Sequence, residues 1–139
     1  DQPRSRGLGD VYTRQVFELV RAMGEKKTEK AISIYSNLLS LKESPYMVLS
    51  LLTRQFRMIL RSALLSAEGA AQAEIASRLE VRDFAVREYL RQSKSFSIKE
   101  LEQALADCLE TDLDIKSGRM AEDLAVELLL MKYSSPSFS

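Results

Sequence analysis

Three arginines recur at helical spacing in the longest uninterrupted segment of the chain, and they are the first candidates for chemistry. Arg54, Arg57 and Arg61 lie at positions i, i+3 and i+7 within residues 44–69, so one side of a helix would carry all three. A guanidinium group can pair with a carboxylate or a phosphate through two parallel hydrogen bonds. The spacing therefore predicts a stripe that pairs with acidic groups, inside the domain or on a partner subunit, or that contacts phosphates. A solvated stripe whose aliphatic stems cover apolar neighbours is the simplest alternative.

A second basic cluster lies in residues 71–94, where two short helical segments flank a tight turn at positions 80–81. The spacing of the small and apolar residues is typical of a helix-turn-helix, in which two short helices cross closely. The second segment has a small local excess of basic residues, which are Arg82, Arg87, Arg91 and Lys94. Glu80 weakens a DNA-binding interpretation, because glycine is favoured at this turn and a carboxylate repels phosphates. Two hypotheses stay open: a DNA-binding regulator, or a helical pair used for packing.

A third feature is the pair Asp112 and Lys116, four residues apart on the same stripe as the apolar residues near Cys108. This spacing predicts an intramolecular ion pair, with a contact to another subunit as the alternative. Cys108 shares the apolar stripe, which predicts a small buried side chain and not a nucleophile.

Several classes of chemistry are excluded by what the sequence lacks. It contains no histidine, so neither a Ser-His-Asp nor a Cys-His catalytic arrangement can form within it. Its five glycines build no phosphate-binding loop, and its single cysteine cannot form an internal disulfide. We therefore expect no catalytic residue, no metal site and no cofactor.

Length and charge indicate one soluble globular domain. The chain has 139 residues, 45% of them apolar, and its 20 basic residues balance its 20 acidic ones. Without a basic excess overall, nucleic-acid binding would need a local patch. The arginines inside residues 44–69 would each cost about 2.5–3.5 kcal/mol in a bilayer, which argues against a membrane span. We expect a cytoplasmic protein that does not bind membranes.

The segment of residues 44–69 is predicted to be the central helix of the fold. Ser44 can cap its N-terminus, Pro45 suits the first helical position, and Gly69 follows its end. Apolar residues occupy two opposite sides of the projected helix, which is typical of a helix clamped between neighbours.

Apolar periodicity predicts further helices and no strand. They are expected over residues 11–23, 28–41, 71–79, 82–94, 98–116 and 121–131. Gly24 and Gly118 are expected to stop helices, Thr28 to cap one, and Ser97 with Glu100 to form a capping box. The predicted fold is an all-α bundle of about seven helices joined by short loops. Residues 1–10 are predicted to be a linker remnant, 11–133 the helical domain, and 134–139 a disordered tail.

The order of these segments resembles one known family. The runs PYMVLSLLTRQFRMIL, EIASRLEVRDFAV, KSFSIKELEQALADCLETDLDIKSG and AVELLLMK resemble, in this order, the C-terminal collar domain of the delta subunit of the bacterial DNA polymerase III clamp loader. The most specific pieces are TRQFR at residues 53–57, FAV at residues 84–86, and Asp112, Lys116 and Gly118. Asp83 and Glu80 depart from the family pattern, where proline and glycine are expected.

The resemblance implies an assembly role. In that family the collar is a helical bundle, and five related collars close into a ring that holds the loader together. The parent subunit opens the sliding clamp through N-terminal domains that are absent here, so this chain would contact other loader subunits, and DNA only indirectly. It would be a non-catalytic part of the DNA polymerase III holoenzyme, whose nucleotidyltransferase activity belongs to the complex. Residues 71–92 would then be a packing motif.

Overall fold

The computed structural model describes residues 2–136, with the side chains of residue 12 and residues 14–136. In this part of the chain there are seven α-helices and no strand, so the predicted all-α fold is confirmed. The helices are α1 (Gln2–Gly24), α2 (Thr28–Ser40), α3 (Pro45–Ala67), α4 (Gln72–Leu79), α5 (Asp83–Ser93), α6 (Ile98–Lys116) and α7 (Glu122–Ser134). None of these helices is both long and apolar enough to cross a bilayer.

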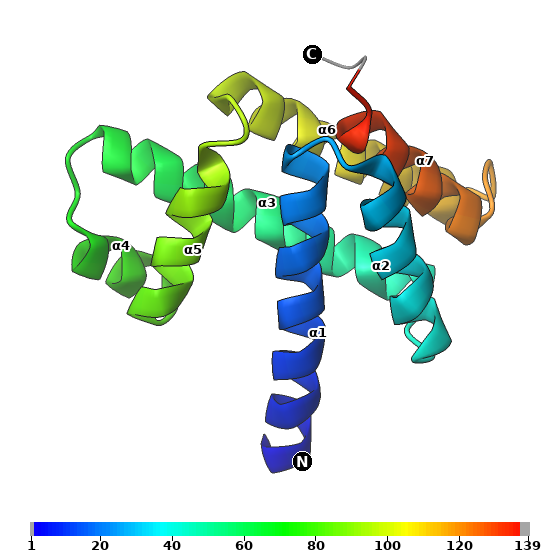
Figure 1. Cartoon of the computed structure of the whole chain (residues 1–139), viewed down its shortest axis with the longest axis horizontal. Helices are drawn as coiled ribbons and strands as arrows, with labels where there is room; N and C mark the ends of the chain where they lie inside the picture. Colours follow the sequence, from blue (N-terminus) through cyan, green and yellow to red (C-terminus); the bar gives the residue numbers. More distant parts are fainter. Residues whose placement is uncertain (1, 137–139) are drawn as a thin grey trace.

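Helix α3 is the centre of the arrangement, as its two-sided apolar pattern predicts. It contacts all six other helices, and Figure 1 shows it running across the molecule behind α1. Its ends form as expected: the Ser44 hydroxyl accepts a hydrogen bond from the Met47 amide at 3.0 Å, and Pro45 is the first helical residue. Gly69 then takes a left-handed conformation with φ of 95°, which ends the helix.

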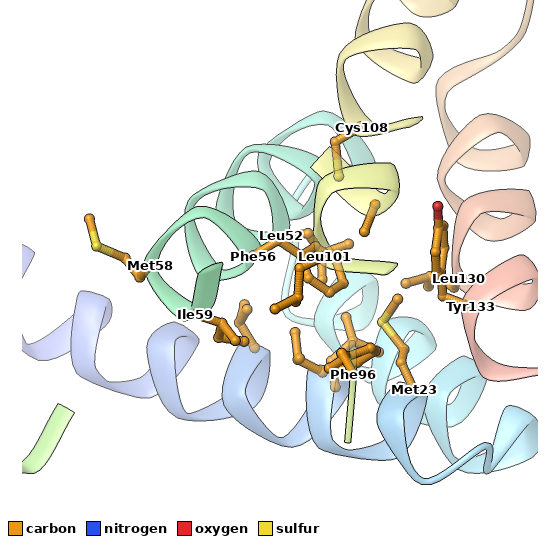
Figure 2. Close-up of a cluster of buried hydrophobic side chains, with 14 of the residues drawn as sticks. Met23, Leu52, Phe56, Met58, Ile59, Phe96, Leu101, Cys108, Leu130 and Tyr133 are labelled. Atoms are coloured by element: carbon orange, nitrogen blue, oxygen red, sulfur yellow. The ribbon is translucent and has the colours of Figure 1, made fainter. Parts of the chain in front are cut away.

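The hydrophobic core joins α3 to α6, α7 and the loop between α5 and α6. Phe56 is fully buried, meets Phe96 edge to face at a centroid distance of 5.8 Å, and lies 6.4 Å from the ring of Tyr133. Figure 2 shows these rings with Leu101 and Leu130 in one cluster. Burial of each such side chain contributes about 1.5–3 kcal/mol, so the cluster is a main source of stability.

A buried polar contact ties α3 to α5 and α1. Helical projection puts Gln55 and Ser62 on a polar flank of α3, yet both are buried, because neighbouring helices cover that flank as well. The Gln55 amide donates to the side-chain oxygen of Gln92 at 3.1 Å, and the Gln92 amide donates to the carbonyl of Phe17 at 2.8 Å. The pairing satisfies polar groups that would otherwise be costly to bury.

The predicted capping box of α6 is confirmed, and the predicted cap of α2 is wrong. Ser97 accepts from the Glu100 amide at 3.0 Å, while Glu100 accepts from the Ser97 amide at 2.9 Å. Thr28 is instead the first residue of α2, and its hydroxyl donates to the carbonyl of Ser134 at 2.7 Å. The hydroxyl is engaged by α7, a partner that local sequence does not reveal.

Gly24 is needed for close packing and not for a left-handed turn. It is the last residue of α1, and a Cβ atom there would be 2.7 Å from the Cβ of Ser95. The left-handed residue that follows α1 is Lys26, with φ of 61°. Helix α1 therefore ends at Gly24 as expected, but Gly24 itself is not the left-handed residue.

The terminal helices extend beyond their predicted bounds. Helix α1 begins at Gln2, where Pro3 is tolerated because a first-turn residue needs no amide donor. Figure 1 shows its first half projecting past the other helices. The division of the chain at residue 10 stays a prediction. Of the tail predicted at residues 134–139, Ser134 belongs to α7 and its hydroxyl donates to the carbonyl of Leu130, whereas residues 137–139 lie outside the described residues.

Asp107 connects α6 to the end of α7. Lys132 donates to its carboxylate at 2.8 Å, Gln103 donates at 3.1 Å, and the Tyr133 hydroxyl donates to the same group. Burial opposes ionisation of Asp107, but these three hydrogen bonds outweigh it and hold the pKa of the carboxyl below its ordinary value.

Replacing Glu80 by glycine tests the turn between α4 and α5. Glu80 has φ of 59°, a left-handed conformation that costs a residue with a side chain about 1–2 kcal/mol. Because glycine loses more freedom on folding, we expect Glu80→Gly to raise the free energy of unfolding by about 1 kcal/mol. Urea denaturation measures this. Glu68→Gly is the matched control, since Glu68 also follows a helix but has φ of −83°, and an equal gain there would contradict the account.

Asp107→Asn tests the link between α6 and α7. At pH 7 we expect the free energy of unfolding to fall by about 1–2 kcal/mol, because charge-assisted hydrogen bonds are lost. The folded pKa of Asp107 lies below its ordinary 3.8, so the carboxylate stabilises the fold above that pH and stops doing so as the pH falls through the folded pKa. The difference between parent and variant should therefore narrow from about pH 5 downward. A difference that stays constant in urea denaturation over this range would contradict the role of Asp107.

Candidate subunit interface on α3 and α6

The three arginines of α3 all reach solvent. Arg54, Arg57 and Arg61 are exposed, and among the described side chains no carboxylate oxygen lies within 4.0 Å of their guanidinium groups. Pairing inside the domain, one of the options left open by the sequence, therefore has no counterpart in this part of the chain. Pairing with a partner, and contact with phosphates, stay predictions.

The TRQFR segment explains why this stripe is held in place. Its Gln55 and Phe56 point inward, one to Gln92 and the other to the aromatic cluster. Arg54 and Arg57 flank them and face outward on the same rigid helix. The backbone that carries the arginines is thus fixed by buried contacts. Binding of a partner therefore costs little backbone conformational entropy here.

A groove runs between α3 and α6 beside Arg57. Its volume is about 220 Å³, and it is lined by Tyr46, Leu49, Ser50, Thr53, Arg57, Cys108, Leu109 and Asp112. Leu49 and Cys108 are buried and form an apolar floor, whereas Arg57 and Leu109 are exposed at the rim. Two groups of residues singled out in the sequence, the arginine stripe and the Asp112 pair, therefore meet at one groove.

The ion pair predicted from the i, i+4 spacing is present at the end of this groove. Lys116 lies 3.1 Å from the carboxylate of Asp112, and its ammonium group is 5.9 Å from the ring centre of Tyr46. A hydrogen bond from Tyr46, then the one from Lys116, lowers the pKa of Asp112. The carboxylate of Asp112 therefore stays ionised at neutral pH, and the positive charge of Lys116 balances it. The arginines are then the unbalanced charges of this surface.

Apolar side chains complete this surface. Leu109 and Leu113, one turn apart on α6, are 61% and 55% exposed, and Met47 of α3 is 45% exposed. Met47 is seven residues before Arg54 and so shares its side of the helix. We call the surface formed by Met47, Arg54, Arg57, Arg61, Leu109 and Leu113 the α3–α6 face. The two leucines were not predicted from the sequence, although apolar residues at i and i+4 on the flank of a buried stripe are the signal for them.

Cys108 behaves as an apolar core residue. Burial raises the pKa of its thiol to about 11, so it stays protonated and unreactive at neutral pH. Among the described residues, no three metal-ligating side chains are placed so that they could hold a metal ion.

The basic residues of the helix-turn-helix segment are only partly free. Helix α5 packs on α3, where Gln92 meets Gln55, and on α1, where the ring of Tyr89 stacks on that of Phe17 at a centroid distance of 5.7 Å. Arg91 pairs with Glu88 at 2.6 Å, and Glu88 also reaches Arg21 of α1 at 3.4 Å.

The other three residues named for that segment, Arg82, Arg87 and Lys94, are exposed. A hollow of about 340 Å³ adjoins α5, lined by Arg14, Phe17, Glu18, Arg21, Phe84, Arg87, Glu88 and Arg91. The arginines of α1 were not singled out in the sequence, and Phe84 was noted only as part of the FAV run, because α1 and α5 become neighbours only in the fold.

The chain is similar to known proteins over most of its length. The family model for the DNA polymerase III delta subunit, C-terminal domain, matches residues 13–133. The DNA polymerase III subunit delta of Bacillus subtilis (strain 168) is 30% identical over 119 residues, which cover 86% of this chain and 34% of that protein. The structure of a Bacillus subtilis DNA clamp loader delta protein is similar with a TM-score of 0.84 at 30% identity, covering 88% of this chain and 36% of that one. The chain thus spans about a third of the length of these relatives.

Two alanine substitutions compare an exposed residue of α3 with a buried contact of α3. Arg57 lies on the surface of α3, and Gln92 of α5 is the buried partner of Gln55 on α3. Arg57→Ala should change the free energy of unfolding by less than about 0.5 kcal/mol, because an exposed residue without an ion pair is removed. Gln92→Ala should lower it by about 2 kcal/mol, because Gln55 and the Phe17 carbonyl lose their partner in the interior. Urea denaturation compares them. A larger loss for Arg57→Ala than for Gln92→Ala would mean that Arg57 supports the fold.

Proposed function

The chain belongs to the family of C-terminal domains of the DNA polymerase III delta subunit, and we propose that it is the subunit-assembly domain of a clamp loader. Its partners are other subunits of the loader, which it helps to hold together while the sliding clamp is loaded onto DNA. The relatives named above support this proposal through their fold and their sequence identity over nearly the whole domain.

One observation supports placing the contact with other subunits on the α3–α6 face. The α3–α6 face combines three unpaired arginines with a groove and exposed leucines, on a helix that is otherwise covered by its neighbours. Exposed apolar side chains next to charges without local partners are typical of surfaces that bind another protein. A partner helix with an apolar stripe and flanking carboxylates would cover the leucines and neutralise the arginines.

No catalytic step is assigned to this chain. In our proposal, nucleotidyl transfer belongs to the polymerase complex, contact with the sliding clamp lies with other parts of the delta subunit, and DNA is reached only indirectly. The site of action would be the cytoplasm, where the replication machinery of a bacterium works.

The alternative of a helix-turn-helix regulator receives no support from the family match. The contacts of α5 with α3 and of Glu88 with Arg91 favour a helical pair used for packing. Arg82, Arg87, Arg91 and Lys94 are therefore not assigned to a DNA groove.

Co-elution with the other loader subunits of the same organism tests the proposal. The chain should move to an earlier volume in size-exclusion chromatography when it is mixed with them. Replacing Arg54, Arg57 and Arg61 together by glutamate should weaken the complex at least about tenfold, because the stripe would then repel a carboxylate partner.

The control replaces Arg78, an exposed arginine of α4 that is paired with Glu74 at 3.9 Å, by glutamate. This variant should co-elute like the parent chain. Absence of co-elution for the parent, although the full-length delta subunit binds in the same run, would overturn the assembly role. Equal binding by the stripe variant would leave that role in place but move the contact elsewhere.

A further inference from the structure

A second exposed apolar stripe lies on α7. Leu124, Leu128 and Met131 follow one another at i, i+4 and i+7 and are 48%, 46% and 43% exposed. The opposite side of α7 carries the buried residues Val126, Leu130 and Tyr133. The helix is thus apolar on both sides, and among the described residues nothing covers the outer one.

Carboxylates flank this stripe. Asp123 and Glu127, one turn apart, lie on its edge towards α2, and neither is within 4.0 Å of a cationic group of the described side chains. The Tyr35 hydroxyl donates a hydrogen bond to the backbone carbonyl of Asp123 at 3.1 Å, and the carboxylates around it affect its pKa. Its pKa is raised first by burial and then by the charges of Asp123, Glu127 and Glu122. This edge of α7 is therefore negative.

On the other edge of the stripe lies a hollow that has room for one side chain of a partner. It lies between α6 and α7, has a volume of about 190 Å³, and is lined by Asp107, Glu110, Thr111, Asp114, Met120, Ala125, Leu128, Leu129 and Lys132. Two of its three carboxylates are neutralised, Asp107 by Lys132 at 2.8 Å and Asp114 by Arg119 at 2.9 Å. Glu110 is exposed and has no such partner among the described side chains.

We propose that this α6–α7 surface, formed by the α7 stripe, Asp123, Glu127 and the hollow with Glu110, is a docking site for a basic amphipathic helix of a partner. The apolar side of that helix would cover Leu124, Leu128 and Met131. Its lysines or arginines would meet Asp123 and Glu127, and one long cationic side chain would lay its stem over Leu128 and bring its charge to Glu110.

Charge decides between this occupant and others. The α3–α6 face exposes unpaired arginines, whereas the α6–α7 surface exposes unpaired carboxylates, so one partner segment cannot suit both. The inference deepens the proposed function by giving the domain a second contact of opposite charge. It rests on that function only in taking the natural partner to be a neighbouring loader subunit.

Two synthetic helical peptides test the site without any loader subunit. Both are about 18 residues long with leucines at i, i+3, i+4 and i+7, and they differ only in carrying lysine or glutamate elsewhere. Each is titrated into the isotope-labelled 139-residue chain, and amide chemical shifts are followed by NMR. The lysine peptide should shift amides of α7 and of the half of α6 that faces it, and the glutamate peptide should not.

Variants sharpen the test. Glu110→Lys combined with Glu127→Lys should weaken binding of the lysine peptide at least about tenfold. Glu68→Lys, which changes an exposed carboxylate after α3, is the matched control and should bind like the parent. The spectrum of the double variant without peptide shows whether the fold is intact, and Leu128→Ser should weaken binding without changing any charge.

The proposal is overturned if the two peptides shift the amides of α7 alike, if the shifts caused by the lysine peptide lie on α3 instead of α7, or if the lysine peptide causes no shifts at about 1 mM. Shifts on both α7 and α3 that grow with the concentration of the chain alone would make a second copy the occupant, which also overturns it. Peptide binding that persists while co-elution with loader subunits fails would refute the proposed function and leave the docking site.

Discussion

The structure depends on the burial of α3 against all six other helices. This contact covers its apolar sides and also encloses Gln55 and Ser62, so the helix keeps only one strip in contact with solvent. Arg54, Arg57 and Arg61 occupy that strip. The buried residues between the arginines fix the backbone of α3. The position of the arginine stripe therefore depends on the packing of the core.

The net charge of zero hides a separation of charge between two surfaces. Unpaired arginines gather on the α3–α6 face, and unpaired carboxylates gather along α7 and at Glu110. Each set lies beside exposed leucines, and each lacks partners among the described side chains. A domain built in this way can accept two different neighbours and reject each at the wrong surface, since like charges repel. This property suits an assembly domain.

Much of the fold follows from local sequence, because helix ends obey short-range chemistry. Ser44 with Pro45, the pair Ser97 and Glu100, and the glycine at position 69 act through neighbours within four residues. The contacts that sequence analysis missed are tertiary. Gln92 meets Gln55, and Thr28 meets Ser134, only after separate helices pack together. Projection of one helix cannot show a second helix that covers its polar side.

Site-specific crosslinking tests the central claim, that the α3–α6 face binds a loader subunit, most directly. A photoreactive benzoylphenylalanine replaces Arg57 in the chain, which is mixed with the other loader subunits and irradiated. The account predicts a covalent product with one of these subunits, identified by mass spectrometry, and none when the same group replaces the exposed Arg78. A product from position 78 with none from position 57, under conditions where the subunits co-elute, would contradict it.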